Sequence, residues 1–555
     1  MKDKKFKVKC ENSGSEIFVD AGVSLLELLK SEKIESDYPI IAAYVNHKTV
    51  DLHYQIYENK SVRFLDTSHF EGAKVYQRTF RFILYKAVCD IFSGCELAIF
   101  GTLGHNSYFE IESVEGNEHN TALLKERIVS IIESDYPILF DIIHYEEAAA
   151  LYEQNKMYDK SRLLASSPSL YVKVNQLENV FGYFYGTLAP STSYVSIFDI
   201  TPLGKGFRLT LADSKKPSNI SQLRNNSKII DIFKAQHKLL DTLEIEDIGA
   251  LNSKINSGNS KELIKIGEAC QERKFAELAD KIYSRCCDRV KLILISGPSS
   301  SGKTTFSNRL TIELRLLGLK PIILSMDDYF INRADTPLNE KGERDFERPD
   351  VIDIELFNSH LSLLLQGEEV EIPRYNFLKG EREWRGSRVK LDQKNIIICE
   401  GIHALNPIMS SSVDNSQKFK LYIAPLTSIA LDNLSCIDTT DIRLIRRIVR
   451  DSAYRGHSAQ QTIKRWGSVR RGEENYILPY QKDADELFDT FLFFEISVLK
   501  QFVLPLLSTV SDLHEEYSQA MRLTSLLAHI QTVEHKNIPP TSILREFIGG
   551  SSFEY

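Results

Sequence analysis

The residues from Gly297 to Thr304 have the types and spacing of a loop that binds phosphate. They read GPSSSGKT, which fits the pattern GxxxxGK[ST]. The glycines let the backbone curl, so that successive N–H groups point inward at an anion. Lys303 would reach the β- and γ-phosphates of a nucleotide, and the Thr304 hydroxyl would bind Mg²⁺. The candidate nucleotide-binding residues are Gly297, Pro298, Ser299, Ser300, Ser301, Gly302, Lys303, Thr304 and Thr305.

The segments on either side of this loop are a predicted strand and a predicted helix. LILIS precedes the loop at 292–296, and TFSNRLTIELRLLG follows it. This is the context that the motif needs, because the helix directs the positive end of its dipole at the bound anion. The alternative is a tight strand–helix turn that binds no ligand.

Two adjacent aspartates follow the next apolar run. PIILS at 321–325 leads into Asp327 and Asp328. Residues just past the carboxyl end of a parallel strand line the ligand crevice. A carboxylate there could orient an acceptor hydroxyl or take its proton. The alternative is a pair of aspartates that caps a helix or faces solvent.

Arginines cluster in the stretch RLIRRIVRDSAYRG. Arg443, Arg447 and Arg450 have the spacing i, i+4, i+7, which places them on one face of a helix. Guanidinium groups bind phosphoryl oxygens bidentately, so this helix could close over the site as a lid and stabilise developing charge. The alternative is a solvated helix face.

The elements that must position these residues alternate between strand and helix. After residue 291, short apolar runs recur as KLILIS, PIILS, NIIIC, FKLYIA and TFLFFE (490–495), mostly with helical stretches between them. This alternation predicts an α/β unit with a parallel sheet covered by helices. We therefore expect an α/β domain at 291–515, followed by a helical tail at 516–555.

The front half of the chain predicts other units. Residues 5–10 and 16–19 alternate like half-buried strands, and Ser24 could cap a short helix beginning at Leu25. With the runs at 41–46 and 61–66, they suggest a compact β-grasp-sized domain at 1–66. Mixed helix and strand follow at 67–240, which indicates an α+β domain. Residues 241–290 are polar and predict a linker with two helices.

Composition narrows the class of protein. The net charge of -8 disfavours a protein whose main work is coating nucleic acid. No run approaches the roughly 18 apolar residues of a membrane span, and the start has no signal-peptide pattern. The eight cysteines form no CxxC pair, so a structural zinc site is not expected. We predict a cytoplasmic protein with reduced thiols and no membrane contact.

Beyond the phosphate loop, further motifs occur in a fixed order. They are SMDDYF, FERPDVIDIELF, IPRYNF, IIICEGIHAL, IRLIRRIVRDSAYRG and LPYQKDAD. In this order, and from Lys291 to near Leu507, the chain resembles the uridine–cytidine kinase and phosphoribulokinase family of P-loop kinases. The resemblance implies ATP and Mg²⁺ as cofactors and a small alcohol as acceptor.

Roles carried over by the resemblance fall on particular positions. Asp327 matches the aspartate that takes the proton of the nucleoside 5′-hydroxyl, and Glu400 matches an acidic residue near the metal, although a carboxylate capping the next turn is the alternative for Glu400. The implied lid arginines are Arg447, Arg450 and Arg455. The implied substrate contacts are Asp327, Tyr329, Glu347, Tyr375, Arg447, Arg455 and Arg465, and the implied catalytic residues are Lys303, Asp327 and Arg450.

Three positions on the acceptor side depart from the family pattern. Glu347 stands where the family has an aspartate that grips the ribose hydroxyls. Gly380 stands where a histidine contacts the base, and Arg465 where a glutamine binds substrate. These departures leave the acceptor open between a pyrimidine nucleoside and another small alcohol.

The front half resembles two modules of threonyl-tRNA synthetases. VDAGVSLLELL, IAAYVN, VDLHYQI and VRFLD resemble a TGS domain, and EEAAALYE with FGYFYGTLAP resembles the second additional, editing domain. Editing depends on HxxxH and CxxxH pairs. In the region that matches HxxxH, His69 is present but Ala73 stands in place of the second histidine. In the region that matches CxxxH, residues 185–191 contain neither cysteine nor histidine. We expect that editing is lost and that this half binds RNA or its own kinase domain, or only scaffolds.

The leading functional hypothesis is ATP-dependent, Mg²⁺-requiring phosphorylation of a pyrimidine nucleoside 5′-hydroxyl. One alternative keeps the fold and changes the acceptor to a purine nucleoside or a sugar phosphate. A second alternative is an RNA-binding regulator whose kinase domain senses nucleotide. The choice between ATP and GTP and the oligomeric state stay open, although members of the family often form homo-oligomers.

Overall fold

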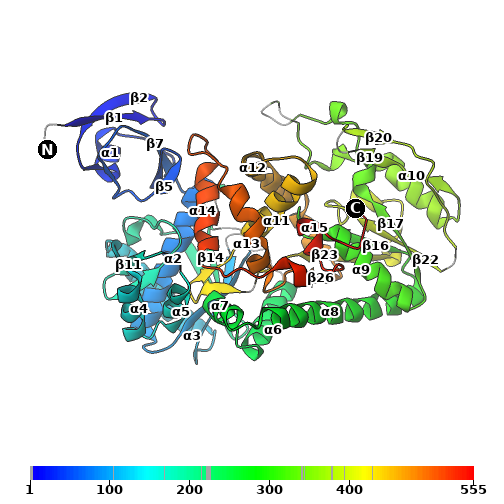
Figure 1. The fold of residues 1–555 in the computed structure, drawn as a ribbon, viewed down its shortest axis with the longest axis horizontal. Coiled ribbons are helices and arrows are strands. Elements are labelled where there is room, and N and C mark those ends of the chain that lie inside the picture. Colours follow the sequence, from blue (N-terminus) through cyan, green and yellow to red (C-terminus); the bar gives the residue numbers. More distant parts are fainter. Residues whose placement is uncertain are drawn as a thin grey trace.

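The computed structural model of the chain describes residues 4–554, apart from residues 104–105, 168, 214, 221–226, 339–341, 343, 377–378, 393 and 428. Figure 1 shows a small N-terminal unit (blue) at one end, a second unit (cyan) beside it and a large α/β unit at the other end. The long helix α8 (Ser260–Asp288) runs along one side toward the α/β unit.

A parallel five-stranded sheet forms the centre of the α/β unit, which confirms the fold class predicted for this region. The strand order is β17-β22-β16-β23-β26, and every adjacent pair is parallel. Because the strands are parallel, their carboxyl ends meet at one edge of the sheet. The strands are β16 (Leu292–Ser296), β17 (Lys320–Ser325), β22 (Asn395–Glu400), β23 (Lys418–Ala424) and β26 (Glu486–Asp489).

Helices cover both faces of this sheet. Ile293 and Ile295 pack in one core with apolar side chains of the helices α8, α9 and α13. Leu292 and Leu294, which alternate with them, pack in a second core that includes side chains of α6 and α10. The helices of this unit and of the segment before it are α6 (Ser227–Thr242), α7 (Ile248–Asn256), α9 (Lys303–Leu316), α10 (Ile354–Leu365), α11 (Thr439–Tyr454), α12 (Ala459–Tyr476), α13 (Glu495–Leu507), α14 (Tyr517–Ala528) and α15 (Arg545–Ile548).

The last predicted strand was placed too late in the sequence. The sheet strand is β26 at 486–489, whereas the apolar run at 490–495 leads into α13. The Asp489 carboxylate accepts hydrogen bonds from the backbone N–H groups of Phe491 (2.8 Å) and Leu426 (2.9 Å), so the chain turns there. The phenylalanines are buried by packing against helices, including Phe494 against Gly267 of α8.

The N-terminal unit is a mixed sheet with one helix. Its order is β2-β1-β7-β4-β5, with β1 antiparallel to β2 and parallel to β7. The predicted cap is confirmed, because Ser24 and Glu27 form a capping box at the start of α1. Membership of the TGS family stays a prediction. The elements are β1 (Lys5–Cys10), β2 (Ser15–Asp20), β3 (Val23–Ser24), α1 (Leu25–Ser31), β4 (Ile40–Val45), β5 (Lys48–Val50), β6 (Gln55–Ile56) and β7 (Lys60–Asp66).

The second unit combines two sheets with helices. One sheet has the order β10-β11-β12 and the other the order β13-β14-β9-β8, with β15 also paired to β14. Its resemblance to an editing domain stays a prediction. The elements are α2 (Phe70–Ile91), β8 (Leu97–Leu103), β9 (Asn106–Ile111), α3 (Glu118–Glu133), β10 (Leu139–His144), α4 (Tyr145–Gln154), α5 (Tyr158–Ala165), β11 (Tyr171–Leu177), β12 (Val180–Tyr183), β13 (Phe198–Leu203), β14 (Gly206–Asp213) and β15 (Lys216–Ile220).

The front half contacts the α/β unit near the start of α11. Lys74 forms an ion pair with Asp438, the residue that precedes α11. Arg522 of α14 pairs with Asp441 in the first turn of α11 (2.6 Å) and lies 3.7 Å from Glu71 of α2. Contact of the front half with the C-terminal α/β unit, one of the expectations for the front half, is therefore observed.

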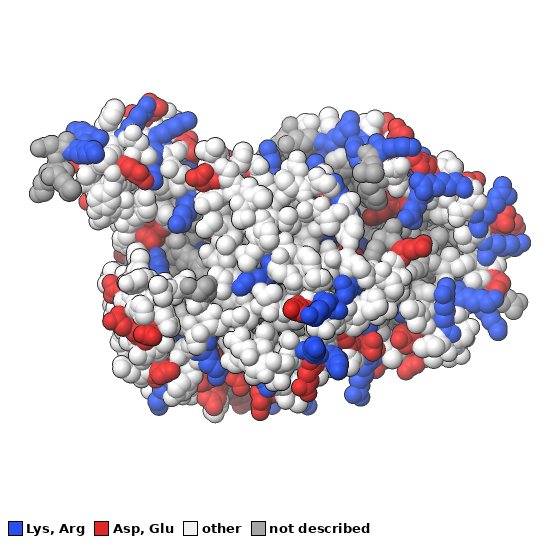
Figure 2. Space-filling view, in the orientation of Figure 1, with Lys and Arg blue, Asp and Glu red and all other residues white. Residues whose placement is uncertain are grey.

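The surface carries charges of both signs. On the face shown in Figure 2, Lys and Arg side chains lie beside Asp and Glu at both ends of the molecule, and the region between them is mostly free of charged side chains in its upper part. Among the residues that the structure describes, no helix has the length and apolar character needed to cross a bilayer.

Candidate active site

The phosphate loop connects β16 to α9 at the carboxyl edge of the sheet. Gly302 is the residue before α9 and has φ +90°, in the left-handed region that glycine adopts without strain. A Cβ on Gly297 would lie 2.2 Å from the Ile423 carbonyl oxygen. Both glycines of the motif are therefore needed, one for the turn and one for close approach to the neighbouring strand.

Lys303 folds back over the loop that precedes it. Its Nζ donates to the carbonyl oxygens of Gly297 (3.1 Å) and Pro298 (3.3 Å). Burial lowers the pKa of Lys303, and the nearby carboxylates of Glu400 and Asp327 oppose that shift. The ammonium group thus lies between the loop and these acidic side chains, within reach of phosphate at the loop.

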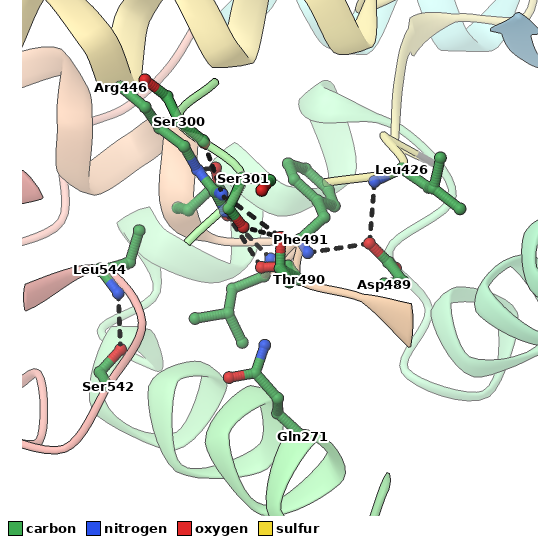
Figure 3. Close-up of polar contacts among 12 residues, drawn as sticks. Gln271, Ser300, Ser301, Leu426, Arg446, Asp489, Thr490, Phe491, Ser542 and Leu544 are labelled. Atoms are coloured by element: carbon green, nitrogen blue, oxygen red, sulfur yellow. Dashed lines mark hydrogen bonds and ion pairs between the residues drawn. The ribbon is translucent and has the colours of Figure 1, made fainter. Parts of the chain in front are cut away.

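A buried arginine supports the loop from behind (Figure 3). The Arg446 guanidinium pairs with Glu495 (2.7 Å) and donates to the Thr490 carbonyl oxygen (3.0 Å). The Thr490 hydroxyl in turn donates to the carbonyl of Ser301 (2.7 Å). Arg446 is completely buried, so this member of the arginine cluster holds the loop in shape and does not face a ligand.

Two carboxylates lie at the ends of adjacent strands. Asp327 follows β17, and Glu400 ends β22. The Ser325 hydroxyl donates to Glu400 (2.9 Å). Burial and the charge of Asp327 raise the pKa of Glu400 to about 7, while Lys303 opposes the shift. Two acids beside one lysine form a site that can hold a proton or a divalent cation.

Asp328 has a different environment from its neighbour. Its carboxylate accepts a hydrogen bond from the Tyr375 backbone N–H (3.1 Å) and lies 3.6 Å from the Arg374 guanidinium. It therefore joins β17 to the short hairpin of β19 (Arg374–Asn376) and β20 (Glu381–Glu383). Of the two aspartates, Asp327 is the one whose charge acts on Lys303 and Glu400.

The arginine helix divides into structural and site-facing members. Arg443 is buried, pairs with Glu473 and donates to the Ser299 carbonyl (3.0 Å). Arg447 donates to the Ser299 hydroxyl (2.8 Å), so it reaches the phosphate loop from α11. The side chains of Arg447, Arg450 and Arg455 all lie near the Asp451 carboxylate, at 3.2, 2.8 and 3.7 Å.

One carboxylate among three guanidinium groups leaves the Asp451 cluster positively charged. The charge of Arg450 and burial lower the pKa of Arg455 to about 10, and Asp451 opposes that shift. Asp451 is itself buried and holds the three arginines in place. Its single negative charge does not offset their three positive charges. Such a cluster can bind an anion with several charged oxygens. Asp451 is not among the predicted site residues, although it lies within the RDSAYRG motif.

The acceptor side is built from several loops. The Glu347 side chain packs against Gly472 of α12. A Cβ on Gly472 would lie 2.2 Å from the Cβ of Glu347. Burial raises the pKa of Glu347, and Arg447 and Lys303 oppose the shift. His403 is buried close to Glu347, with its pKa lowered by burial to about 4, so it is neutral. Its signal in the sequence was its place in the EGIHAL motif.

Other predicted acceptor residues are placed differently from one another. Tyr375 is buried and contacts the ring of Phe330 edge-on. Arg465 is exposed, and its guanidinium lies 3.1 Å from His457. The expectation for Tyr329 is corrected, because this residue is completely buried and its hydroxyl meets His360 (3.1 Å) in the core. The apolar ring of Tyr329 packs beside Phe357, which explains that position.

Gly380 occupies the position where a histidine was expected. It has φ +77°, and a Cβ built on it would lie within 2.8 Å of the Arg333 side chain. A larger residue would therefore be strained and would displace Arg333. Arg333, from the segment that follows β17, thus lies against this position of the hairpin.

The residues near Lys303 fit a Mg²⁺ ion shared with phosphate. Within the described ranges, no three His, Cys, Asp or Glu side chains group as a complete metal site. Mg²⁺ usually takes one or two carboxylates and completes its shell with phosphate and water oxygens. Asp327, Glu400 and the Thr304 hydroxyl offer this kind of hard oxygen ligand.

Comparison with known proteins gives the family of this unit. Residues 292–492 match the Phosphoribulokinase / Uridine kinase family. A uridine kinase from Staphylococcus epidermidis is 30% identical over 200 residues, covering 36% of this chain and 86% of that protein. One from Bacillus pumilus is 33% identical over 196 residues, covering 35% of this chain and 83% of that protein. The chain belongs to the phosphoribulokinase / uridine kinase family.

Family membership makes the α/β unit a P-loop phosphotransferase. The matched residues end at 492, so the segments with Glu495 and α15 lie beyond them. A solved structure described as a possible uridine kinase from Bacillus stearothermophilus has 21% sequence identity and a TM-score of 0.27, and the match covers 39% of this chain and 98% of that one.

Proposed function

We propose that the chain is an ATP-dependent kinase that phosphorylates the 5′-hydroxyl of a pyrimidine nucleoside. The observation that carries this proposal is the grouping of Lys303, Asp327 and Glu400 at the mouth of the phosphate loop. The relatives from Staphylococcus epidermidis and Bacillus pumilus are uridine kinases, which supports a nucleoside as the acceptor.

Each group at the site has one task in this reaction. The loop amides and Lys303 hold the phosphates of the donor. Asp327 orients the acceptor hydroxyl and takes its proton. The Asp451 cluster, through Arg447, Arg450 and Arg455, stabilises negative charge on the transferred group. Mg²⁺, held by Thr304 and Glu400, supplies neutralising charge when bound.

The acceptor is held by the loops around Glu347 and Tyr375. Glu347 accepts hydrogen bonds from the ribose hydroxyls, and Gly472 leaves room for its longer side chain. Tyr375 packs against the base. Arg465, exposed on α12, reaches the acceptor from outside the buried part of the site. Transfer is in line and needs no covalent intermediate, so positioning and electrostatics account for the rate.

A second candidate acceptor is a purine nucleoside or a sugar phosphate. Arg333 beside Gly380 favours it, because this guanidinium lies against the position where the family places a base-contacting histidine. An anionic or carbonyl-rich acceptor suits an arginine better than a histidine does.

The test is a coupled ADP-release assay on the full chain with uridine, cytidine, adenosine, guanosine and several sugars and sugar phosphates. Turnover highest with uridine or cytidine supports the first proposal. Turnover confined to purine nucleosides or sugar phosphates replaces it with the second. If no acceptor is phosphorylated, while the front half binds tRNA tightly, the chain is a nucleotide-sensing regulator.

A further inference from the structure

A carboxylate from the C-terminal segment reaches the first turn of α9. One Glu546 oxygen accepts hydrogen bonds from the Thr305 backbone N–H (3.1 Å) and from the Thr305 hydroxyl (2.9 Å). The two residues are 241 positions apart. Glu546 belongs to α15, which Figure 1 shows in red close to α11 and α9.

Thr305 belongs to the group of donors that a nucleotide would use. The first turn of a helix has N–H groups without partners inside the helix, and these bind anions. In a P-loop they continue the row of loop amides that cradles phosphate. A carboxylate and a phosphate oxygen are both anionic acceptors, so Glu546 and a phosphate at this turn compete for the same donors.

The segment that carries Glu546 is firmly packed. Ile543, Leu544 and Phe547 are completely buried and belong to the core that contains Ile293 and Phe306. A Cβ on Gly302 of the phosphate loop would lie 2.8 Å from Ile543. The segment is therefore part of the wall of the loop, and its carboxylate is not a loose surface group.

Polar contacts hold the turn around α15 in shape. The Arg545 guanidinium donates to the carbonyls of Ile538 (2.6 Å) and Gly549 (3.2 Å). Ser542 accepts a hydrogen bond from the Leu544 backbone N–H at 3.2 Å (Figure 3). Glu546 itself is only half-buried. Rotation of its side chain can therefore withdraw the carboxylate while its buried neighbours stay in place.

The same segment packs on the arginine helix. The Arg446 guanidinium carbon lies 5.0 Å from the centroid of the Phe547 ring. Arg446 in turn donates to the Ser300 carbonyl of the phosphate loop. The Glu546 carboxylate also lies close enough to Lys303 to favour its charged form. One residue beyond the matched family region thus acts on two donor-binding groups, Thr305 and Lys303.

We propose that Glu546 is a donor-site residue that competes with a nucleotide phosphate for Thr305, lowers nucleotide affinity and speeds release of the spent nucleotide. The ligand class is a nucleoside di- or triphosphate. The inference rests on the donor-binding role of the loop in the proposed function, and it does not depend on which alcohol is the acceptor.

The test is calorimetric titration of Mg–ADP and Mg–ATP into the full chain and into Glu546→Gln. The amide keeps the size of the side chain and removes its charge, so we expect about tenfold tighter binding. Glu546→Ala should shift affinity in the same direction, and thermal melting verifies that both variants are folded. Stopped-flow displacement of a fluorescent ADP should show slower release from Glu546→Gln.

Glu534→Gln is the matched control. Glu534 lies in the same C-terminal segment, pairs with Lys536 and is 68% exposed, so its variant has the same charge change away from the loop. Affinity that is equal in wild type and Glu546→Gln, or weaker in the variant, overturns the inference. Tighter binding without phosphorylation of any acceptor would keep the inference and reject the proposed reaction. Uridine phosphorylation with unchanged nucleotide affinity in Glu546→Gln would keep the proposed reaction and reject the inference. Failure of every variant to bind nucleotide rejects both.

Discussion

The two sides of the candidate site are built in different ways. The donor side is a run of consecutive residues between one strand and one helix, and in the proposed function backbone groups of this run bind the donor phosphates. The acceptor side collects Asp327, Glu347 and Tyr375 from separate loops, so its shape depends on how those loops pack. The family pattern is intact in the first region and altered in the second, at Glu347, Gly380 and Arg465. The phosphate loop is therefore readable from local sequence, whereas in the proposed function the choice of acceptor depends on packing between distant segments.

The largest expected effect separates the two neighbouring aspartates. Asp327→Asn should lower kcat by about 10²–10⁴, because it removes the group that we propose takes the acceptor proton. Asp328→Asn keeps an acceptor for the Tyr375 backbone N–H, so it should change mainly the acceptor KM. Steady-state ADP release with saturating nucleotide measures both.

Equal losses of kcat in the two aspartate variants would contradict the assignment of Asp327. They would show that the bond from Asp328 to the β19–β20 hairpin affects turnover as strongly as the Asp327 carboxylate does. Circular dichroism of both variants excludes loss of fold as the cause.

The next prediction compares Arg446, which holds the phosphate loop in shape, with Arg447, which belongs to the charged Asp451 cluster. Arg446→Ala should destabilise the protein by about 3–5 kcal/mol, because it leaves the buried Glu495 carboxylate without its partner. Arg447→Ala, one position along α11, removes a half-buried side chain and should lower turnover while changing stability much less. Urea unfolding and the ADP-release assay measure the two effects. If Arg447→Ala lost as much stability as Arg446→Ala, the division of this helix would be wrong.

The smallest effect concerns Glu400, which lies between the two sides. Its pKa is raised from 4.5 to about 7 by burial and by Asp327, so the folded protein binds more protons than the unfolded chain between these values. Stability from this group is therefore present at low pH and is lost as the pH rises from about 4.5 toward 7. Glu400→Gln removes this dependence and should be the more stable protein at pH 8, by on the order of 1–3 kcal/mol.

Thermal melting of wild type and Glu400→Gln between pH 5 and 8, without nucleotide, measures the difference. A gap in Tm that stays constant over this range would show that Glu400 titrates normally. Glu400→Gln should also lose turnover in the presence of Mg²⁺. A variant that is more stable but less active shows that the loss of activity does not come from unfolding.

Much of the fold could be predicted because local patterns carry it. The apolar runs at 292–296, 321–325, 395–399 and 419–424 lie in strands of the sheet, and Ser24 caps a helix as expected. The prediction failed at 490–495, where an apolar run packs between helices, since hydrophobicity marks burial and does not distinguish a strand from a turn between helices. Tyr329 failed for a related reason, because an aromatic residue beside a catalytic motif can equally belong to the core.

By itself, the sequence determined the phosphate loop, the parallel sheet behind it and the family of the unit, because a binding loop made of consecutive residues carries its geometry in its spacing. Only the tertiary structure decided which arginines of α11 face the loop and which are buried, and that the Glu546 carboxylate meets Thr305. Those relations join residues far apart in the chain, and they depend on the packing of helices against the sheet, which no local spacing records.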